Sequence, residues 1–387
     1  MLIGLGESIM SKYLKSIIIL SLLLLAVVPA KAAISYTVTD LGNFAPRAIN
    51  AKGDVIGNIS NDAYSSIAVL YSNGTLTELG TLGGSYTYAA GINDIGQIVG
   101  YSNTSSGESH AFLYNNGEMT DLGTFGGMYG YAYGINNSGQ ITGGFTTDGL
   151  VQHAFLYSGS TIIDLGTLGG KHSTPHGINN SGQVVGESHY TKFYSHAFLY
   201  SSSMTDIDTL GGIFSAANSI NDSGQAVGVV FTITALHAFL YTDSTMYDLG
   251  TLGGTNSFAC GINNSGQIVG EASITGDAAS HAFLYSGSTM FDLNTLIDPL
   301  SGWILESVMD INDAGLIVGK GYNGSQYHAF LLTPVPEPST VCLLCLDLIG
   351  FLTYKRHSQK RASKTTQKHI QSVTDQFSQS LITISGV

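Results

Sequence analysis

Short runs of about five apolar, β-branched and aromatic residues recur between residues 36 and 332, and glycine-containing turns separate them. No helical periodicity of 3.6 residues appears in this region. Such a pattern is typical of short β-strands joined by tight turns. In one stretch it predicts strands at residues 120–124, 131–136, 140–145 and 153–157. We therefore expect the whole region to be all β.

Three motifs recur in a constant order along these strands. His-Ala-Phe occurs six times at spacings of 41 to 47 residues, while Gly-Ile-Asn and Asp-Leu-Gly, with their looser copies, each occur seven times. The histidines are His110, His153, His196, His237, His281 and His328. A fixed period of this length indicates an array of small units, and four short strands per unit is the pattern of propeller blades.

The two ends of the array differ by one strand. It begins with the Asp-Leu-Gly strand near Asp40, and it ends with the His328 strand, after which no Asp-Leu-Gly strand follows. We therefore predict an all-β, seven-bladed β-propeller of ~43-residue repeats, in which the N-terminal strand closes the last blade. Gly-Ile-Asn strands would be innermost and Asp-Leu-Gly strands outermost. The alternative, an open β-solenoid, would need polar caps at both ends.

The N-terminus has the pattern of an export signal. Lys12 and Lys15 precede an apolar run at residues 17–28, and small residues at Ala30 and Ala32 form a cleavage motif. We predict a signal peptide at residues 1–32, with Met10 as an alternative start, followed by the propeller at residues 33–333.

The charge of the expected propeller is strongly acidic. Residues 33–333 contain five basic and 23 acidic residues, a balance of −18. Such a surface repels phosphate backbones, so we predict no nucleic-acid partner.

The repeats and the C-terminus each resemble a known family feature. The three recurring motifs resemble those of the HAF-repeat family of bacterial extracellular proteins, to which no general activity is attached. Pro336, Glu337 and Pro338, then the apolar residues 341–354 and a basic pair, resemble a PEP-CTERM sorting signal at residues 334–362. The resemblance implies processing by an exosortase, a short transmembrane segment at residues 341–354 that anchors the chain transiently in the inner membrane, and delivery to the envelope, the outer surface or beyond. Asp347 and the polar tail at residues 363–387, which we expect to be disordered, depart from this signal.

The repeated histidines predict no metal site, because one histidine per blade places them too far apart to share an ion. We expect them to brace neighbouring strands. We find no catalytic motif and predict no cofactor.

Function is expected where the units differ, in the segments that lead into the inner strands. Their aromatic residues would gather at one mouth of a central channel and stack on sugar rings. The candidates are Tyr86, Tyr88, Tyr129, Tyr131, Tyr133, His172, His176 and Trp303. We expect a non-enzymatic structural component, or one that binds exopolysaccharide or other envelope proteins. The alternative is a secreted glycosidase or lyase that acts on polysaccharide.

Overall fold

The computed structural model describes residues 34–62, 65–147, 151–191 and 194–335, together with residues 371, 372 and 374. The expected signal peptide, the sorting motif and the apolar segment 341–354 lie outside these residues. In the part of the chain that is described, no helix is both long enough and apolar enough to cross a membrane.

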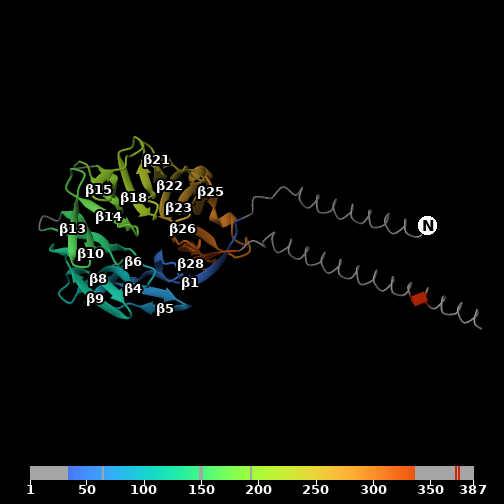
Figure 1. The fold of residues 1–387 in the computed structure, drawn as a ribbon, viewed down its shortest axis with the longest axis horizontal. Helices are drawn as coiled ribbons and strands as arrows, with labels where there is room; N and C mark the ends of the chain where they lie inside the picture. The colour runs from blue at the N-terminus through green and yellow to red at the C-terminus, as the bar shows by residue number, and fades with distance from the viewer. Residues whose placement is uncertain are drawn as a thin grey trace, which may run out of the picture. The chain divides into compact units, whose positions relative to one another are not determined.

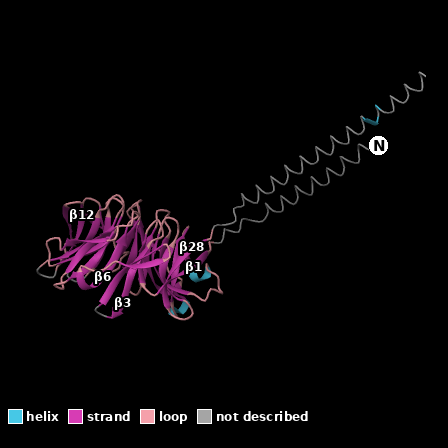
Figure 2. Cartoon of the chain, turned by 90° about the horizontal axis from the view of Figure 1, so that it is seen from below, coloured by secondary structure: helices cyan, strands magenta, loops and turns pink. Residues whose placement is uncertain are grey.

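Nearly all of the regular structure is short strand (Figure 2). The strands pair antiparallel and follow one another in groups of four. The first two groups are β2 (Ala45–Ile49), β3 (Val55–Asp62), β4 (Ser65–Ser72) and β5 (Thr75–Glu78), then β6 (Gly83–Ile92), β7 (Ile98–Thr104), β8 (Ser109–Asn115) and β9 (Glu118–Gly123). The next two are β10 (Tyr129–Ile135), β11 (Ile141–Thr146), β12 (Gln152–Ser158) and β13 (Thr161–Gly166), then β14 (Ser173–Ile178), β15 (Val184–His189), β16 (Ser195–Tyr200) and β17 (Met204–Asp206).

The remaining strands continue this order to the end of the array. They are β18 (Phe214–Ile220), β19 (Ala226–Phe231), β20 (Leu236–Thr242) and β21 (Thr245–Asp248), then β22 (Gly253–Ile262), β23 (Ile268–Ile274), β24 (Ser280–Ser286) and β25 (Thr289–Asp292), and finally β26 (Ile304–Ile311), β27 (Ile317–Tyr322) and β28 (Tyr327–Pro334). Two 3-10 turns, η1 (Thr275–Asp277) and η2 (Leu293–Thr295), lie between strands.

Among the described residues, five sheets have four strands and one has eight, because a single parallel bridge between Ser66 and Tyr86 joins two neighbouring groups. The groups are arranged around a common axis (Figure 1). As expected, the Gly-Ile-Asn strands lie next to the axis and the Asp-Leu-Gly strands lie at the outer edges. Radial repetition of four-stranded antiparallel sheets is the architecture of a β-propeller.

The first strand of the array lies beside the last one. β1 (Tyr36–Gly42) pairs antiparallel with β28, from Tyr36 opposite Pro334 to Gly42 opposite Ala329. The resulting sheet has the order β1-β28-β27-β26, so the N-terminal strand occupies the outer edge that the sequence leaves vacant.

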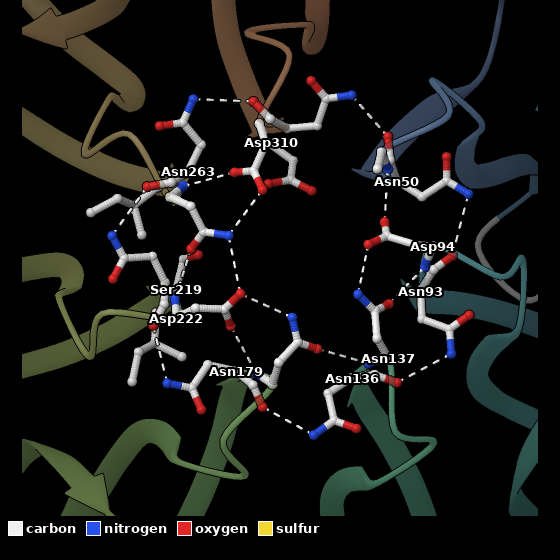
Figure 3. A pocket seen from close by; sticks show the side chains of 18 of the residues that line it. Asn50, Asn93, Asp94, Asn136, Asn137, Asn179, Ser219, Asp222, Asn263 and Asp310 are labelled. Atoms are coloured by element: carbon white, nitrogen blue, oxygen red, sulfur yellow. Dashed lines mark hydrogen bonds between the residues drawn. The ribbon is translucent and has the colours of Figure 1, made fainter.

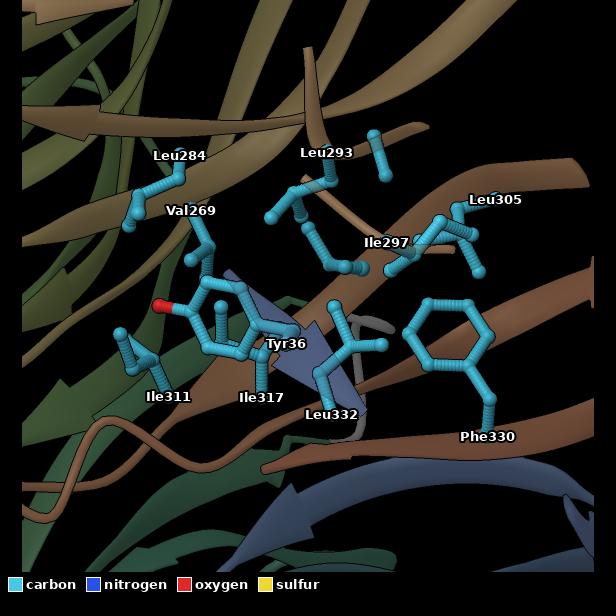
Figure 4. Close-up of a cluster of buried hydrophobic side chains, with 12 residues drawn as sticks. Tyr36, Val269, Leu284, Leu293, Ile297, Leu305, Ile311, Ile317, Phe330 and Leu332 are labelled. Atoms are coloured by element: carbon cyan, nitrogen blue, oxygen red, sulfur yellow. The ribbon is translucent and has the colours of Figure 1, made fainter. Parts of the chain in front are cut away.

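The core lies between successive sheets. The phenylalanine of each His-Ala-Phe motif is fully buried, at Phe112, Phe155, Phe198, Phe239, Phe283 and Phe330. In the last such cluster, Tyr36 from β1 packs with Phe330 and with Val269 from the preceding sheet (Figure 4). A buried aromatic side chain contributes about 1.5–3 kcal/mol by its removal from water. Each sheet therefore depends on its neighbours for its core.

Candidate functional site

Seven buried asparagines surround the axis at the ends of the inner strands (Figure 3), all within the described residues. They are Asn50, Asn93, Asn136, Asn179, Asn221, Asn263 and Asn312. Each side-chain N–H group donates to the backbone carbonyl of the next asparagine, over 2.9–3.3 Å. The last of these bonds runs from Asn312 to Asn50. Because the amides bind one another, this ring stabilises the fold rather than presenting free polar groups.

A second layer of polar side chains lies outside the asparagines. Backbone N–H groups donate to the side chain of the next unit, for example from Ala51 to Asp94 over 2.8 Å and from Asp94 to Asn137 over 2.9 Å. The two layers line a cavity of 220 Å³ on the axis. Here too the oxygens already accept bonds from the protein.

The repeated histidines brace the outer two strands of every group except β2–β5, where Ile67 takes the place of the histidine. In every case the histidine Nδ1 lies 2.6–2.9 Å from the aspartate of an Asp-Leu-Gly motif. The pair His328 and Asp40 joins the last His-Ala-Phe strand to the first strand of the array. Burial raises the pKa of Asp40, but hydrogen bonds from His328 and from the backbone of Gly42 outweigh it and lower the pKa overall. These contacts explain why the two motifs recur together.

Four of the predicted aromatic residues meet in one place. Tyr86, Tyr88, Tyr131 and Tyr133 form a tyrosine cluster with Tyr101 of β7, which the sequence analysis missed because it lies on a second strand. Tyr101 is central: its ring centroid lies 5.1 Å from that of Tyr88 and 5.0 Å from that of Tyr131. The tyrosines lie within β6, β7 and β10 rather than in loops, because the inner strands begin earlier than predicted.

The tyrosine cluster is half-buried and neutral at physiological pH. Burial is the main cause of the raised pKa of Tyr101, and it raises the pKa of Tyr133 to about 12. The phenols of Tyr101 and Tyr133 therefore stay protonated and can donate hydrogen bonds, while the exposed parts of the rings in the cluster can stack.

The other four predicted residues have different partners. Trp303 packs edge-on against Phe330, with ring centroids 6.0 Å apart, and so belongs to the core of the last sheet. His172 contacts His189, and His176 donates from Nδ1 to the carbonyl of Ala217 over 3.1 Å.

Tyr129 is partly buried at the start of β10, close enough to Tyr131 to add to the raised pKa that burial gives Tyr131. Ring contacts thus join four of the eight predicted residues, and Trp303 packs against the core of the last sheet instead. Trp303 is drawn into the core by its apolar area, and the two histidines are held by strand neighbours.

A β-bulge in every inner strand places one extra residue next to the Gly-Ile position. The register shifts occur around Arg47, Ala90, Tyr133, His176, Asn218, Cys260 and Met309. Bulges re-aim side chains and are common beside functional sites. The residue type at this position differs in every unit. The side chains that the bulges place near the axis are therefore not part of the repeated pattern.

Arg47 is the only arginine or lysine among these bulge residues. It is exposed, and its guanidinium carbon lies 5.2 Å from the centroid of the Tyr88 ring. Burial raises the pKa of Tyr88 and of Cys260 and lowers that of His176, and the guanidinium charge acts on all three groups. Because these residues come from three other inner strands, Arg47 lies close to the axis.

Asp310 is an acidic group on the same axis. Its carboxylate accepts hydrogen bonds from the backbone N–H of Ile49 over 3.0 Å and of Ile311 over 2.9 Å. The bond to Ile49 links the last inner strand to β2. Surrounding protein raises the pKa of Asp310 to about 6, although water in the axial cavity still reaches the residue.

A second cavity, of 370 Å³, lies between β23, β24 and β26. Its lining includes Glu271, Ala279, Ser280, His281, Ile304, Glu306 and Ser307. Burial raises the pKa of Glu271, whereas Glu306 accepts a hydrogen bond from the hydroxyl of Tyr327 over 3.0 Å. Two carboxyl groups in different environments thus line one cavity. The sequence analysis missed them because they lie on strands of different sheets.

No protein-family model matches the chain, and no curated protein matches it. Among solved structures, a puromycin hydrolase is similar with a TM-score of 0.50 at 10% identity, over 74% of this chain and 51% of that one. A puromycin-hydrolyzing peptidase from Mycobacterium tuberculosis has a TM-score of 0.49 at 10% identity, over 76% of this chain and 50% of that chain. The β-propeller domain of the Trilobed protease from Pyrococcus furiosus has a TM-score of 0.36 at 10% identity, over 68% of this chain and 100% of that chain. The chain thus spans about half the length of the two hydrolases. At this identity the likeness concerns the fold alone.

Proposed function

We propose that this chain is an exported, closed seven-bladed β-propeller that acts as a non-enzymatic glycan-binding or structural component of the cell surface or extracellular matrix. Closure is supported by three contacts between the ends of the array: the pairing of β1 with β28, the pair His328–Asp40, and the bond from Asn312 to Asn50. The location at the cell surface or in the matrix is supported by the export signal at residues 1–32 and by the sorting signal at residues 334–362, with an exosortase as the processing partner.

The tyrosine cluster is the observation that carries the binding role. Five rings from β6, β7 and β10 contact one another beside the axis, where the repeats impose no tyrosine. Sugar rings stack on aromatic faces through their apolar C–H surfaces, and phenolic hydroxyls bind sugar hydroxyls. A neutral aromatic surface on an acidic, exported protein therefore favours a carbohydrate ligand.

A glycan array with the exported protein tests this role. We expect Tyr101→Leu and Tyr131→Leu to reduce binding about tenfold or more, since each removes a stacking face. Tyr247→Leu is the matched control, because this tyrosine is 51% exposed on the outer strand β21. Trp303→Leu should lower the melting temperature and leave the glycan affinity of the folded protein unchanged. If no glycan binds, or if Tyr101→Leu and Tyr247→Leu behave alike, the proposed role is wrong.

The second cavity favours one alternative function, hydrolysis or elimination on a polysaccharide. A carboxyl with a raised pKa can act as an acid while a second carboxylate acts as a base or nucleophile. Glu271 and Glu306 have the required difference in environment. An assay for polysaccharide depolymerisation, with Glu271→Gln and Glu306→Gln as variants, separates this function from binding. Depolymerisation that is lost in both variants would replace the non-enzymatic role.

A further inference from the structure

We propose that the axial surface formed by Arg47 and the tyrosine cluster binds the end of a glycan chain that carries a single acidic sugar. This inference rests on the proposed glycan-binding role and names the ligand class of the same site. The carboxylate of the terminal sugar pairs with Arg47, and the neutral sugars behind it stack on the tyrosines.

Arg47 has the features of an unsatisfied anion-binding group. In the described part of the chain, its guanidinium takes part in no ion pair and no hydrogen bond, and it lies over the face of the Tyr88 ring. A guanidinium stacked on a ring keeps its N–H edge free, and that edge matches the two oxygens of a carboxylate. Asp310 also lies at the axis, but both of its oxygens accept backbone N–H groups instead.

The charge of the surroundings limits the ligand to one acidic group. Residues 33–333 carry a balance of −18, so a polyanion is repelled as it approaches. Other carboxyl groups, among them Glu187 and Glu271, lie part-buried on the second strands of their sheets. One isolated cation in an acidic protein can therefore hold one carboxylate but not a run of them.

The tyrosines identify the rest of the ligand as a carbohydrate. Tyr88 contacts both Arg47 and Tyr101, and Tyr101 contacts Tyr131, so the charged and aromatic parts form one continuous surface. Two rings lie nearly parallel, with 23° between Tyr88 and Tyr101, whereas Tyr131 meets Tyr101 edge-on at 86°. Successive sugar units can therefore contact ring faces and hydroxyls in turn.

Calorimetry on the exported protein tests the proposal with two matched probes. One is a tetrasaccharide in which three glucose units are followed by one terminal glucuronate. The other is the same tetrasaccharide with the glucuronate carboxylate converted to its methyl ester. We expect the acid to bind about tenfold more tightly than the ester, because only the acid can pair with the guanidinium. This comparison uses the unaltered protein and so does not depend on whether a variant folds.

Variants assign the difference to Arg47. Arg47→Gln should reduce the affinity for the acid to that for the ester, and Arg47→Lys should give an intermediate value, because lysine keeps the charge and loses the planar fork. Lys52→Gln is the control: it removes one positive charge from an exposed turn at the other end of β2 and should change neither affinity. Tyr131→Leu should weaken both probes equally.

Each outcome decides one claim. Equal binding of acid and ester, or a preference that survives Arg47→Gln, overturns the acidic-sugar inference while the glycan-binding role stands. Binding of neither probe, with or without binding of a peptide through its free C-terminal carboxylate, overturns the acidic-sugar inference, and the glycan array then decides the glycan-binding role.

Discussion

Asp310 lies where the other inner strands have glycine, serine or alanine, and it bonds across to Ile49 of the first unit. Arg47 lies at the bulge of that first unit. Both residues depart from the repeat at the axis, yet their positions there could not be predicted from the sequence. A bulge shifts the alternation of side chains by one residue, and the motif pattern gives no sign of it. The tyrosines were predictable as a group, but Tyr101 was not, since it comes from a different strand.

The pH dependence of stability tests the environment of Asp310. Its pKa is raised to about 6, so the folded protein holds this proton more tightly than the unfolded chain does. The contribution is fully present below a pH of about 4 and is lost as the pH rises through about 6. The resulting loss in the free energy of unfolding is at most about 3 kcal/mol, and solvent screening at this part-buried residue makes it smaller.

Asp310→Asn removes the titration at nearly constant size. Denaturant unfolding at pH 4 and pH 7 should show the variant gaining stability relative to the unaltered protein at the higher pH. Parallel pH profiles for the two proteins would mean that Asp310 titrates normally.

At the scale of the elements, the inner strand and its partner are unusually close. The bulge brings the carbonyl of Tyr131 towards Gly143 of β11, and a Cβ there would lie 2.0 Å from that oxygen. The equivalent glycines in the other sheets are in the same situation, for example Gly100 and Gly270. The sequence predicted four strands per unit correctly but placed the strand boundaries between residues 120 and 157 one or two residues off, since glycine turns mark the loops and not the last paired residue.

Gly143→Ala should therefore destabilise the protein by about 3 kcal/mol or more, because the backbone oxygen cannot move without breaking the sheet. Gly117→Ala is the control. That glycine has a φ of +89° in an open turn, with no atom within 4 Å of the added Cβ, and the change should cost only about 1 kcal/mol. Chemical denaturation of both variants gives the comparison, and equal costs would show that the close approach is not real.

At the scale of the whole molecule, the first strand of the array pairs with its last strand. The order of the motifs was sufficient to predict which strand is missing from the last unit, because each unit is otherwise complete. The motif order could not predict which side chains of β1 pack against the last two sheets. Tyr36 is 4% exposed between the last two sheets, and no motif marks it.

A single substitution measures how much the packing of β1 against the last two sheets contributes to the free energy of unfolding. Tyr36→Ala should lower the free energy of unfolding by about 3–5 kcal/mol, as expected for a large side chain lost from a core. Thr37→Ala, at the exposed neighbouring position, should have little effect. Equal, small effects in thermal unfolding would indicate that β1 adds nothing to the last sheet.

Cross-linking of the two end strands tests closure most directly. Thr37 and Thr333 are opposite each other in the β1–β28 ladder and are both exposed. In the double variant Thr37→Cys, Thr333→Cys, mild oxidation should link positions 37 and 333, detectable by peptide mass mapping, and should raise the melting temperature. The control pair Thr37→Cys, Thr289→Cys, with the second site on the outer strand of the preceding sheet, should not form the link. Absence of a link between positions 37 and 333 in folded protein would contradict the closed ring.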